Sequence, residues 1–356
     1  MQQIGQDSIL CWTFEYSCVT NYRRRGMVTE TNTFMIMALN LTTNISEKGT
    51  CNLTASQLEK VVLPVLYAII ICVGLPANFM ALWMFLQQNR KHGILIYLMN
   101  LAMADLISCL TLPFRASLLL MGDSWKERSP TCTIVMIIIN FSFYYTVSCS
   151  TIFLAFISIS RYAMIVKPNN RRLNKFYDTC FAQLACTVTW LITTIPILAL
   201  NLNYFFKEVN LIDEGGSMCY NIHLQYGKRV SASAFVTVAI IFLIILAMFA
   251  FSYASIALHL CTVRRKGISQ RNRVIHFRAQ MIIIAAMTGF IVCHLPYHIY
   301  QIAAGMQRLN NDKCQWLLES HHVKLITLWF VSLSSCLNPI LYFLLSKSFV
   351  ENRLKR

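Results

Sequence analysis

Long apolar stretches separated by short polar segments make up most of the chain. A membrane-spanning helix needs about 20 mainly apolar residues. Seven stretches reach that length, at residues 60–86, 94–121, 133–166, 179–205, 230–260, 274–305 and 323–345. Polar and turn-forming residues gather in the connections, at 87–93, 122–131, 167–178, 207–228, 264–273 and 307–319. The pattern predicts an all-α membrane protein built as a bundle of seven transmembrane helices.

Basic residues occupy alternate connections and so predict the orientation. One set of connections and the end of the chain carry Arg90, Lys91, Lys167, Arg171, Arg172, Lys175, Arg264, Arg265, Lys266, Arg271, Arg273, Lys347, Arg353, Lys355 and Arg356. The opposite set carries Asp123, Glu127, Glu208, Asp213, Glu214, Asp312 and Glu319. Because basic loops stay in the cytoplasm, we expect an extracellular tail at 1–58, a membrane domain at 59–346 and a cytoplasmic helix and tail at 347–356.

The composition supports a membrane protein and weakens the case for other classes. The chain is 56% hydrophobic and only 13% charged, whereas soluble domains carry about 25% charged residues. A formal net charge of +16 could indicate nucleic-acid binding. However, the basic residues lie in short segments that set the topology, so no nucleic-acid partner is expected. The fourteen cysteines form no CxxC pair that would indicate zinc or redox chemistry.

Three N-glycosylation sequons agree with an extracellular tail. They begin at Asn40, Asn44 and Asn52, on the side of the membrane where glycans are attached. The chain shows no obvious cleavable signal peptide. Met35 and Met37 are alternative translation starts, and either would make the residues before it dispensable.

Asp105 is the one acid among fifteen that lies in the middle of a predicted span. A carboxylate within the bilayer is costly and indicates function by default, although a structural hydrogen-bonding role is the alternative. Polar residues of other spans could face it: Asn78, Ser150, Ser334, Ser335 and Asn338. Hard cations prefer oxygen ligands, so Asp105, Ser150 and Asn338 form a candidate site for an allosteric sodium ion; we expect no other cofactor.

Ordered motifs along the predicted spans resemble those of rhodopsin-like G-protein-coupled receptors. They are Ala77-Asn78, Leu101-Ala102-Met103-Ala104-Asp105, Ser160-Arg161-Tyr162, Trp190, Tyr253, Phe290, Cys293-His294-Leu295-Pro296 and Asn338-Pro339-Ile340-Leu341-Tyr342. Each motif alone is weak evidence, but together they occur in order and in the proper span. Segments 112–115 and 296–298 further resemble the branch of purinergic nucleotide and lipid receptors, and 217–221 and 313–315 resemble an orphan receptor of the family.

The resemblance implies a receptor that activates a heterotrimeric G protein and performs no chemistry itself. Arg161 would contact the G protein, supported by Tyr253 and Tyr342. Prolines remove backbone hydrogen bonds from helices, so Pro296 and Pro339 would act as hinges. The expected coupling and switch residues are thus Arg161, Tyr162, Tyr253, Phe290, Pro296, Asn338, Pro339 and Tyr342, followed by a short amphipathic helix along the membrane near Phe349.

Two extracellular disulfides follow from the resemblance. Cys132 would pair with Cys219, and Cys51 would pair with Cys314, although Cys11 or Cys18 could compete for the second bridge. The oxidising exterior of the cell permits both bonds.

Three departures from the family pattern affect the expected switch. Ser160 replaces the acid that usually pairs with the motif arginine, which predicts raised basal activity. His294 stands where the family has tryptophan or phenylalanine, and Ile245 replaces the usual proline of the fifth span.

The outer half of the bundle is expected to hold the ligand. Arg115 and Lys324 would anchor a small anionic molecule, with His298 and Gln301 as polar neighbours, because arginine offers bidentate hydrogen bonds to phosphate or carboxylate. Basic side chains that merely reach toward the membrane interface are the alternative. A transporter or channel for small anions is the competing class, but the spans lack a relay of ionisable groups and show no repeated halves. An intramembrane enzyme is less favoured, since no HExxH or GxSxG motif occurs.

Overall fold

A computed structural model of the chain describes residues 57–88, 92–121, 130–213, 232–265, 270–307 and 314–353. Every regular element within these ranges is helical. In chain order they are η1 (Leu58–Val62, a π-helical turn), α3 (Leu63–Leu86), α4 (Gly93–Met121), α5 (Pro130–Val166), α6 (Arg171–Asn174), η3 (Lys175–Tyr177), α7 (Thr179–Asp213), α9 (Ala232–Arg265), α10 (Gln270–Gln307) and α11 (Cys314–Arg353).

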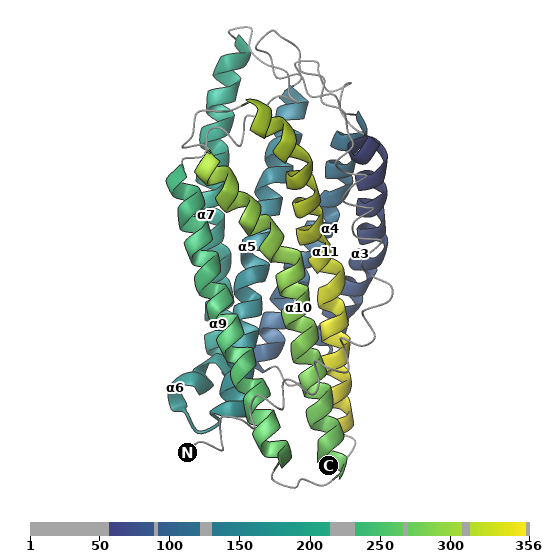
Figure 1. The fold of residues 1–356 in the computed structure, drawn as a ribbon, viewed down its shortest axis with the longest axis vertical. Helices are drawn as coiled ribbons and strands as arrows, with labels where there is room; N and C mark the ends of the chain where they lie inside the picture. Colours follow the sequence, from purple (N-terminus) through teal and green to yellow (C-terminus); the bar gives the residue numbers. More distant parts are fainter. Residues whose placement is uncertain are drawn as a thin grey trace. The chain divides into compact units, whose positions relative to one another are not determined.

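The long helices from Glu59 onward lie side by side as one bundle (Figure 1). Helix α5 contacts α4, α7 and α9, while α10 packs between α9 and α11. The last helix, α11, packs against the first, α3, so the bundle closes on itself. This arrangement confirms the predicted all-α bundle.

Several helices extend past the apolar stretches that predicted them. Helix α7 continues to Asp213, α10 begins at Gln270 and α11 begins at Cys314. Hydropathy marks only the part of a helix that lipid surrounds, whereas backbone hydrogen bonds continue the helix into polar sequence. The segment expected to form a short helix after the seventh span continues α11 without a break as far as Arg353.

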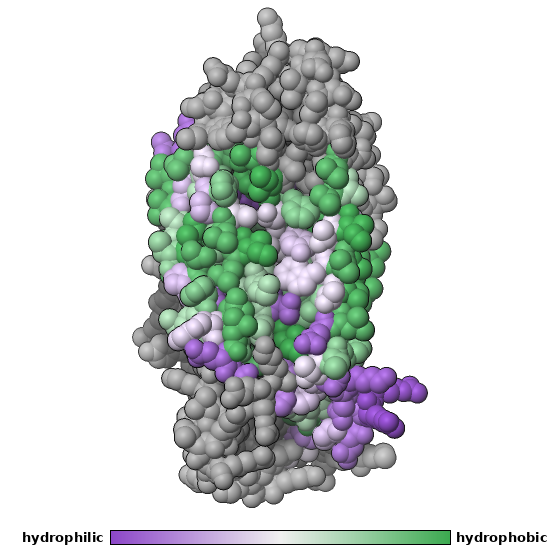
Figure 2. All heavy atoms as spheres, turned by 180° about the vertical axis from the view of Figure 1, so that it is seen from behind, coloured by the Kyte–Doolittle hydropathy of each residue, from purple (hydrophilic) through white to green (hydrophobic). Residues whose placement is uncertain are grey.

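The bundle exposes large apolar side chains that lipid would cover. Among the described residues, five helices are long and apolar enough to cross a membrane: Leu58–Leu86, Gly93–Leu120, Ile138–Val166, Thr179–Ala199 and Ile240–His259. Phe79 is 66% exposed and Ile195 65% exposed. Figure 2 shows one such face, where broad hydrophobic areas lie above a strongly hydrophilic patch. Such a surface belongs in a bilayer and not in water.

Candidate functional site

Asp105 lies at the centre of a hydrogen-bonded cluster in the bundle interior. Its side chain is 1% exposed. Asn338 of α11 donates from Nδ2 to Asp105 Oδ2 at 2.8 Å, and Ser335 donates from Oγ to Asp105 Oδ1 at 3.2 Å. Asp105 therefore joins α4 to α11 through two side chains that are themselves buried.

Asn78 of α3 adds the first helix to this cluster. Its Nδ2 donates to Ser335 O at 2.7 Å and to Gly74 O at 2.9 Å. A Cβ atom at Gly74 would lie 3.0 Å from Cys109 Sγ, so a glycine here allows α3, α4 and α11 to approach closely. Sequence analysis had placed Asn78 and Ser335 among the polar residues able to face Asp105.

The other two polar residues named with them are also buried. Ser150 lies in α5, and Ser334 donates its hydroxyl to Val331 O at 2.7 Å. Carboxylate and hydroxyl oxygens at Asp105 and Ser335 fit a hard cation such as sodium. Within the described part of the chain, no group of three or more His, Cys, Asp or Glu side chains could hold a metal ion, so the cluster offers nothing that would favour zinc.

The C-terminal end of α5 carries Arg161, whose side chain is buried although charged. Tyr253 of α9 is buried close enough to interact with it electrostatically. Tyr162 is half-buried and packs its ring against Phe251 at 5.8 Å. The side chain of Tyr342 lies outside the described residues. The structure thus brings Tyr253 to Arg161, while Tyr162 packs against Phe251 of the same helix, α9.

Ser160 connects α5 to the loop that follows it. Its side chain is fully buried, and its hydroxyl donates to Phe176 O at 3.0 Å. An aspartate at this position, the usual acid of the family, could not donate that hydrogen bond. Serine at this position therefore cannot form the ion pair that an acid would form with Arg161. It instead makes a hydrogen bond to the loop.

Two short helices in this loop, α6 and η3, were missed in the sequence because hydropathy shows only a polar segment. Asn170 caps α6 by accepting hydrogen bonds from Arg172 N and Leu173 N at 3.1 and 3.3 Å. An asparagine before a short polar run is a helix-start signal that could have predicted it.

The same loop packs closely on the start of α4. A Cβ atom at Gly93 would lie 2.7 Å from Phe176 O and 2.8 Å from Tyr177 O. The His92 ring stacks on Tyr177 with a centroid distance of 5.1 Å. Only glycine at position 93 lets the backbone of α4 approach the backbone of the loop this closely. The loop therefore packs tightly against the bundle.

A series of aromatic rings runs through α9 and α10. His298 stacks on Phe242 at 3.6 Å, Phe242 on Phe290 at 6.0 Å, and Phe290 on Phe249 at 4.7 Å. Phe249 then meets Tyr253 edge-on at 4.6 Å. Phe290, expected as a switch residue, is the middle ring of this series, which ends at the neighbour of Arg161.

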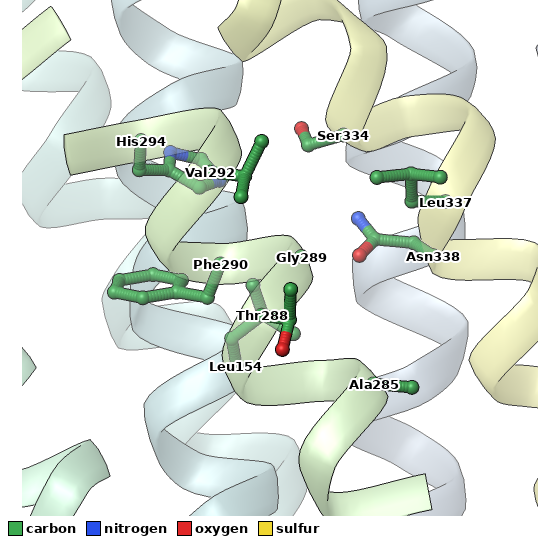
Figure 3. Close-up of a pocket in the computed structure, with 10 residues that line it drawn as sticks. All are labelled: Leu154, Ala285, Thr288, Gly289, Phe290, Val292, His294, Ser334, Leu337 and Asn338. Atoms are coloured by element: carbon green, nitrogen blue, oxygen red, sulfur yellow. The ribbon is translucent and has the colours of Figure 1, made fainter. Parts of the chain in front are cut away.

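His294 lies beside that series next to a cavity. Figure 3 shows the cavity, which has a volume of about 290 Å³ and is lined by Leu154, Ala285, Thr288, Gly289, Phe290, Val292, His294, Ser334, Leu337 and Asn338. The His294 ring stacks on Phe290 at 5.0 Å and is 1% exposed. Neither ring nitrogen has a hydrogen-bond partner within the described ranges. His294 therefore stands where the family has an aromatic ring without hydrogen-bonding nitrogens or with a single N–H. Its own two nitrogens are buried without a partner among the described residues.

Arg115 lies in the opposite half of α4 from the start of the helix at Gly93. Its guanidinium carbon is 4.6 Å from the centre of the Phe143 ring. Arg115 also interacts electrostatically with Tyr67 of α3. Yet Arg115 Nη1 and the Tyr67 hydroxyl are both buried, and neither has a partner with hydrogen-bond geometry among the described residues. Arginine carries five donors, so this guanidinium retains capacity for a ligand.

Tyr297 connects Arg115 to a second predicted residue. Gln301 donates from Nε2 to the Tyr297 hydroxyl, and Tyr297 interacts electrostatically with Arg115. Tyr297 also packs edge-on against Phe143 at 5.6 Å. Tyr297 was not among the expected ligand residues, although it lies between two residues that were named, Pro296 and His298.

The remaining ligand candidates lie around this group. His298 is buried against Phe242. Lys324 is half-buried, one helical turn before Leu328, which packs with Phe143 and Tyr297 in one apolar cluster. Residues four apart share a helix face, so Lys324 lies on the same side of α11 as that cluster.

Glu59 is a buried acid that sequence analysis placed just before the first span. It lies in η1 and is 1% exposed. His321 Nε2 and His322 Nδ1 of α11 lie 3.4 and 3.5 Å from Glu59 Oε1. The adjacent histidines, His321 and His322, were the feature of the sequence that could have indicated a buried acid nearby.

Several predicted residues fall outside the described residues or side chains. They are the cysteines expected in disulfides, Cys51, Cys132, Cys219 and Cys314, and the glycosylation sites, Asn40, Asn44 and Asn52. These remain predictions.

Residues 77–342 match the family described as 7 transmembrane receptor (rhodopsin family). Probable G-protein coupled receptor 82 of Mus musculus is 28% identical over 330 residues, which cover 86% of this chain and 97% of the relative. Proteinase-activated receptor 3 of Bos taurus is 31% identical over 84% of this chain and 74% of the relative. Probable G-protein coupled receptor 34 of Mus musculus is 26% identical over 98% of this chain and 87% of the relative.

Proposed function

Because this chain belongs to the rhodopsin family of seven-transmembrane receptors, we propose that it responds to a small anionic ligand from outside the cell. Membership makes it a multi-pass membrane protein that signals through a heterotrimeric G protein and is not an enzyme. We propose the class of the ligand, the position of its site and the outward orientation of the N-terminus.

The proposal depends above all on Arg115. A buried charged group is costly unless it is paired, and within membranes such groups indicate ligand or ion sites. Arg115 as a whole is half-buried, but its Nη1 atom is buried and has no partner with good hydrogen-bond geometry among the described residues, although the Tyr67 hydroxyl lies beside the guanidinium. A phosphate or carboxylate would accept from this nitrogen and offset the charge.

The surroundings of Arg115 favour an anion attached to an apolar or aromatic group. Phe143, Tyr67 and Tyr297 surround the guanidinium with rings, which favour flat or apolar ligand surfaces. His298, Gln301 and Lys324 would supply further polar contacts. Nucleotides, lysophospholipids and aromatic or fatty carboxylates meet this description.

The series of rings between His298 and Tyr253 supports a route from ligand to G protein. A ligand that displaces His298 or Tyr297 would move α10, in which Pro296 provides the hinge. The shift of Phe290 against Phe249 would reach Tyr253 and release Arg161 toward the G protein. Pro339 and Tyr342 would accommodate the same movement in α11.

A sodium ion at Asp105 would stabilise the resting bundle. The ion would take carboxylate oxygens of Asp105 and the hydroxyl of Ser335, with Ser150 and Asn338 as neighbours. The ion would supply only a positive charge that holds α4 and α11 in their present contact.

The direct test is loading of purified G proteins with a GTP analogue by membranes that contain the receptor. Panels of nucleotides, lysophospholipids and carboxylates should include at least one agonist, and its effect should fall in Arg115→Gln at normal surface expression. A neutral agonist unaffected by Arg115→Gln would contradict the proposed ligand class. Anion flux or current without G-protein loading would instead support a transporter or channel.

A further inference from the structure

Two imidazoles of α11 face one buried carboxylate of η1. Glu59 Oε1 lies 3.4 Å from His321 Nε2 and 3.5 Å from His322 Nδ1. The Glu59 and His321 side chains are 1% and 3% exposed, whereas His322 is 25% exposed. The cluster therefore joins the first and last helices at one end of the bundle, and only His322 is open to protons from solvent.

The charge of this cluster changes with its proton count. When both histidines are neutral, the carboxylate carries one negative charge. One imidazolium offsets that charge, but a second leaves an uncompensated positive charge in a buried place, which is unfavourable. A single carboxylate can thus hold one protonated histidine but not two.

Among the side chains that the structure describes in this region, no second acid accompanies Glu59, although Glu319 also belongs to α11, two positions before His321. Next to Glu59 on the same helix is Lys60, and Lys324 follows the histidines on α11. Helix α4, which also packs on α3, contributes Arg115 near Tyr67. Lys60, Lys324 and Arg115 are cationic, so none of them supplies the negative charge that a second proton on the histidine pair would need.

We propose that Glu59, His321 and His322 form a proton-sensitive latch between the outer ends of α3 and α11, which opens when the extracellular medium becomes acidic. The two helix ends stay together while the pair carries at most one proton. A second proton separates them and displaces the outer part of α11, which also carries Lys324.

The direction of the effect follows from His322, which lies just outside the predicted seventh span. Burial lowers the pKa of His322, Glu59 opposes this shift and His321 adds to it. A histidine whose pKa is lowered in the closed state binds protons better in the open state. The closed state is therefore fully favoured above the ordinary histidine pKa of about 6.5 and loses stability as the pH falls below it.

Hydrogen–deuterium exchange of the full-length receptor in lipid nanodiscs can test the latch without a ligand or a G protein. Peptides covering residues 57–64 and 318–326 should exchange faster as the pH falls below about 6.5, after correction for the intrinsic rate. Uptake of one extra proton on opening would raise the opening constant by up to about tenfold per pH unit. EDTA in every sample excludes a metal ion as the cause.

Single substitutions give the decisive comparison. His321→Gln or His322→Gln leaves one histidine with one carboxylate, so acid should no longer speed exchange in these peptides. Glu59→Gln removes the offsetting charge and should enlarge the acid effect. His259→Gln, on α9, is the matched control and should behave like wild type.

Two results would overturn the proposal. One is an acid-induced rise that persists in both single histidine variants, and the other is wild-type exchange that does not change with pH. Because exchange reports on the helix ends alone, a negative result here leaves the anionic ligand and G-protein coupling untouched.

Discussion

Asn338 Nδ2 donates a hydrogen bond to Asp105 Oδ2 across 2.8 Å. This bond connects α11 to α4, although the two residues are 233 positions apart in the sequence. Asp105 keeps its carboxylate inside the bundle because α11 supplies donors to it. A group held in this way can respond to an ion as well as to movement of α11.

Asp105→Asn is expected to remove the effect of sodium on ligand-free signalling. Replacing choline chloride by sodium chloride at equal ionic strength should lower GTP loading in the wild type, because the proposed ion would stabilise the resting bundle. The asparagine preserves the shape of the side chain but removes the charge. Ser334→Ala, which affects a hydroxyl bonded within its own helix, should retain the sodium effect. An unchanged sodium response in Asp105→Asn would contradict the site.

Arg115→Gln should weaken an anionic agonist strongly. Loss of a hydrogen bond between charged groups costs about 1.5–3 kcal/mol, which corresponds to about a 10- to 150-fold increase in the agonist concentration for half-maximal GTP loading. Lys324→Ala should produce a smaller increase, since an ammonium is more strongly hydrated than a guanidinium and cannot hold an anion through two parallel hydrogen bonds. Agonist potency that is unaltered in Lys324→Ala would remove this residue from the site.

Ser160→Asp should lower ligand-free signalling by restoring an acid beside Arg161. An ion pair worth about 0.5–1 kcal/mol would reduce basal GTP loading about two- to fivefold. The substitution also removes the hydrogen bond from Ser160 to Phe176 O. Ser160→Ala loses the same hydrogen bond without adding an acid, so it is the control. Equal basal activity in the two variants would exclude a latch made by the acid.

Gly93→Ala should destabilise the loop that contains Phe176 and Tyr177. The added Cβ atom would overlap two backbone carbonyl oxygens, and the resulting shift should lower the melting temperature by a few degrees, given a cost of about 1–3 kcal/mol. Gly289→Ala is the matched control, because the nearest atom, Leu337 Cδ1, is 3.9 Å from the added carbon. Thermal unfolding of the purified protein in detergent measures both, and similar melting temperatures would show that the loop can move away.

His294→Phe should raise the melting temperature. Phenylalanine keeps the stacking on Phe290 but removes two buried nitrogens without partners among the described residues. An unsatisfied buried polar group costs about 1–3 kcal/mol, so the gain should be a few degrees. His294→Ala should lower the melting temperature instead, since it loses the stacked ring. A loss of stability in His294→Phe would indicate that an internal water molecule or ligand satisfies the histidine.

Hydropathy predicted the bundle because the bilayer imposes one requirement, apolar side chains over a fixed length. Hydropathy also predicted that Asp105 would lie inside the membrane domain, because it falls in the middle of an apolar stretch. What hydropathy could not predict is how chain segments meet outside lipid. Gly93 and Phe176 contact each other through backbone atoms, and no side-chain pattern records that contact.

Polar pairs between distant helices were only partly predictable. The polarity of Asn338 and Ser335 suggested that they could face Asp105, but they were named together with other equally polar residues. Glu59 was not singled out in the sequence, because it lies at the very start of the membrane domain, just before an apolar stretch. Its burial depends on His321 and His322, which become neighbours only when α11 packs against α3.

Asn78 also bears on how the protein is made. Its amide donates to Ser335 O, which lies 257 positions later in the chain. The ribosome must therefore synthesise nearly all the remaining spans before the first one finds this acceptor. Until then an amide in α3 lies within the bilayer without its final acceptor, and variants that delay arrival of the last span should be retained and degraded in the endoplasmic reticulum.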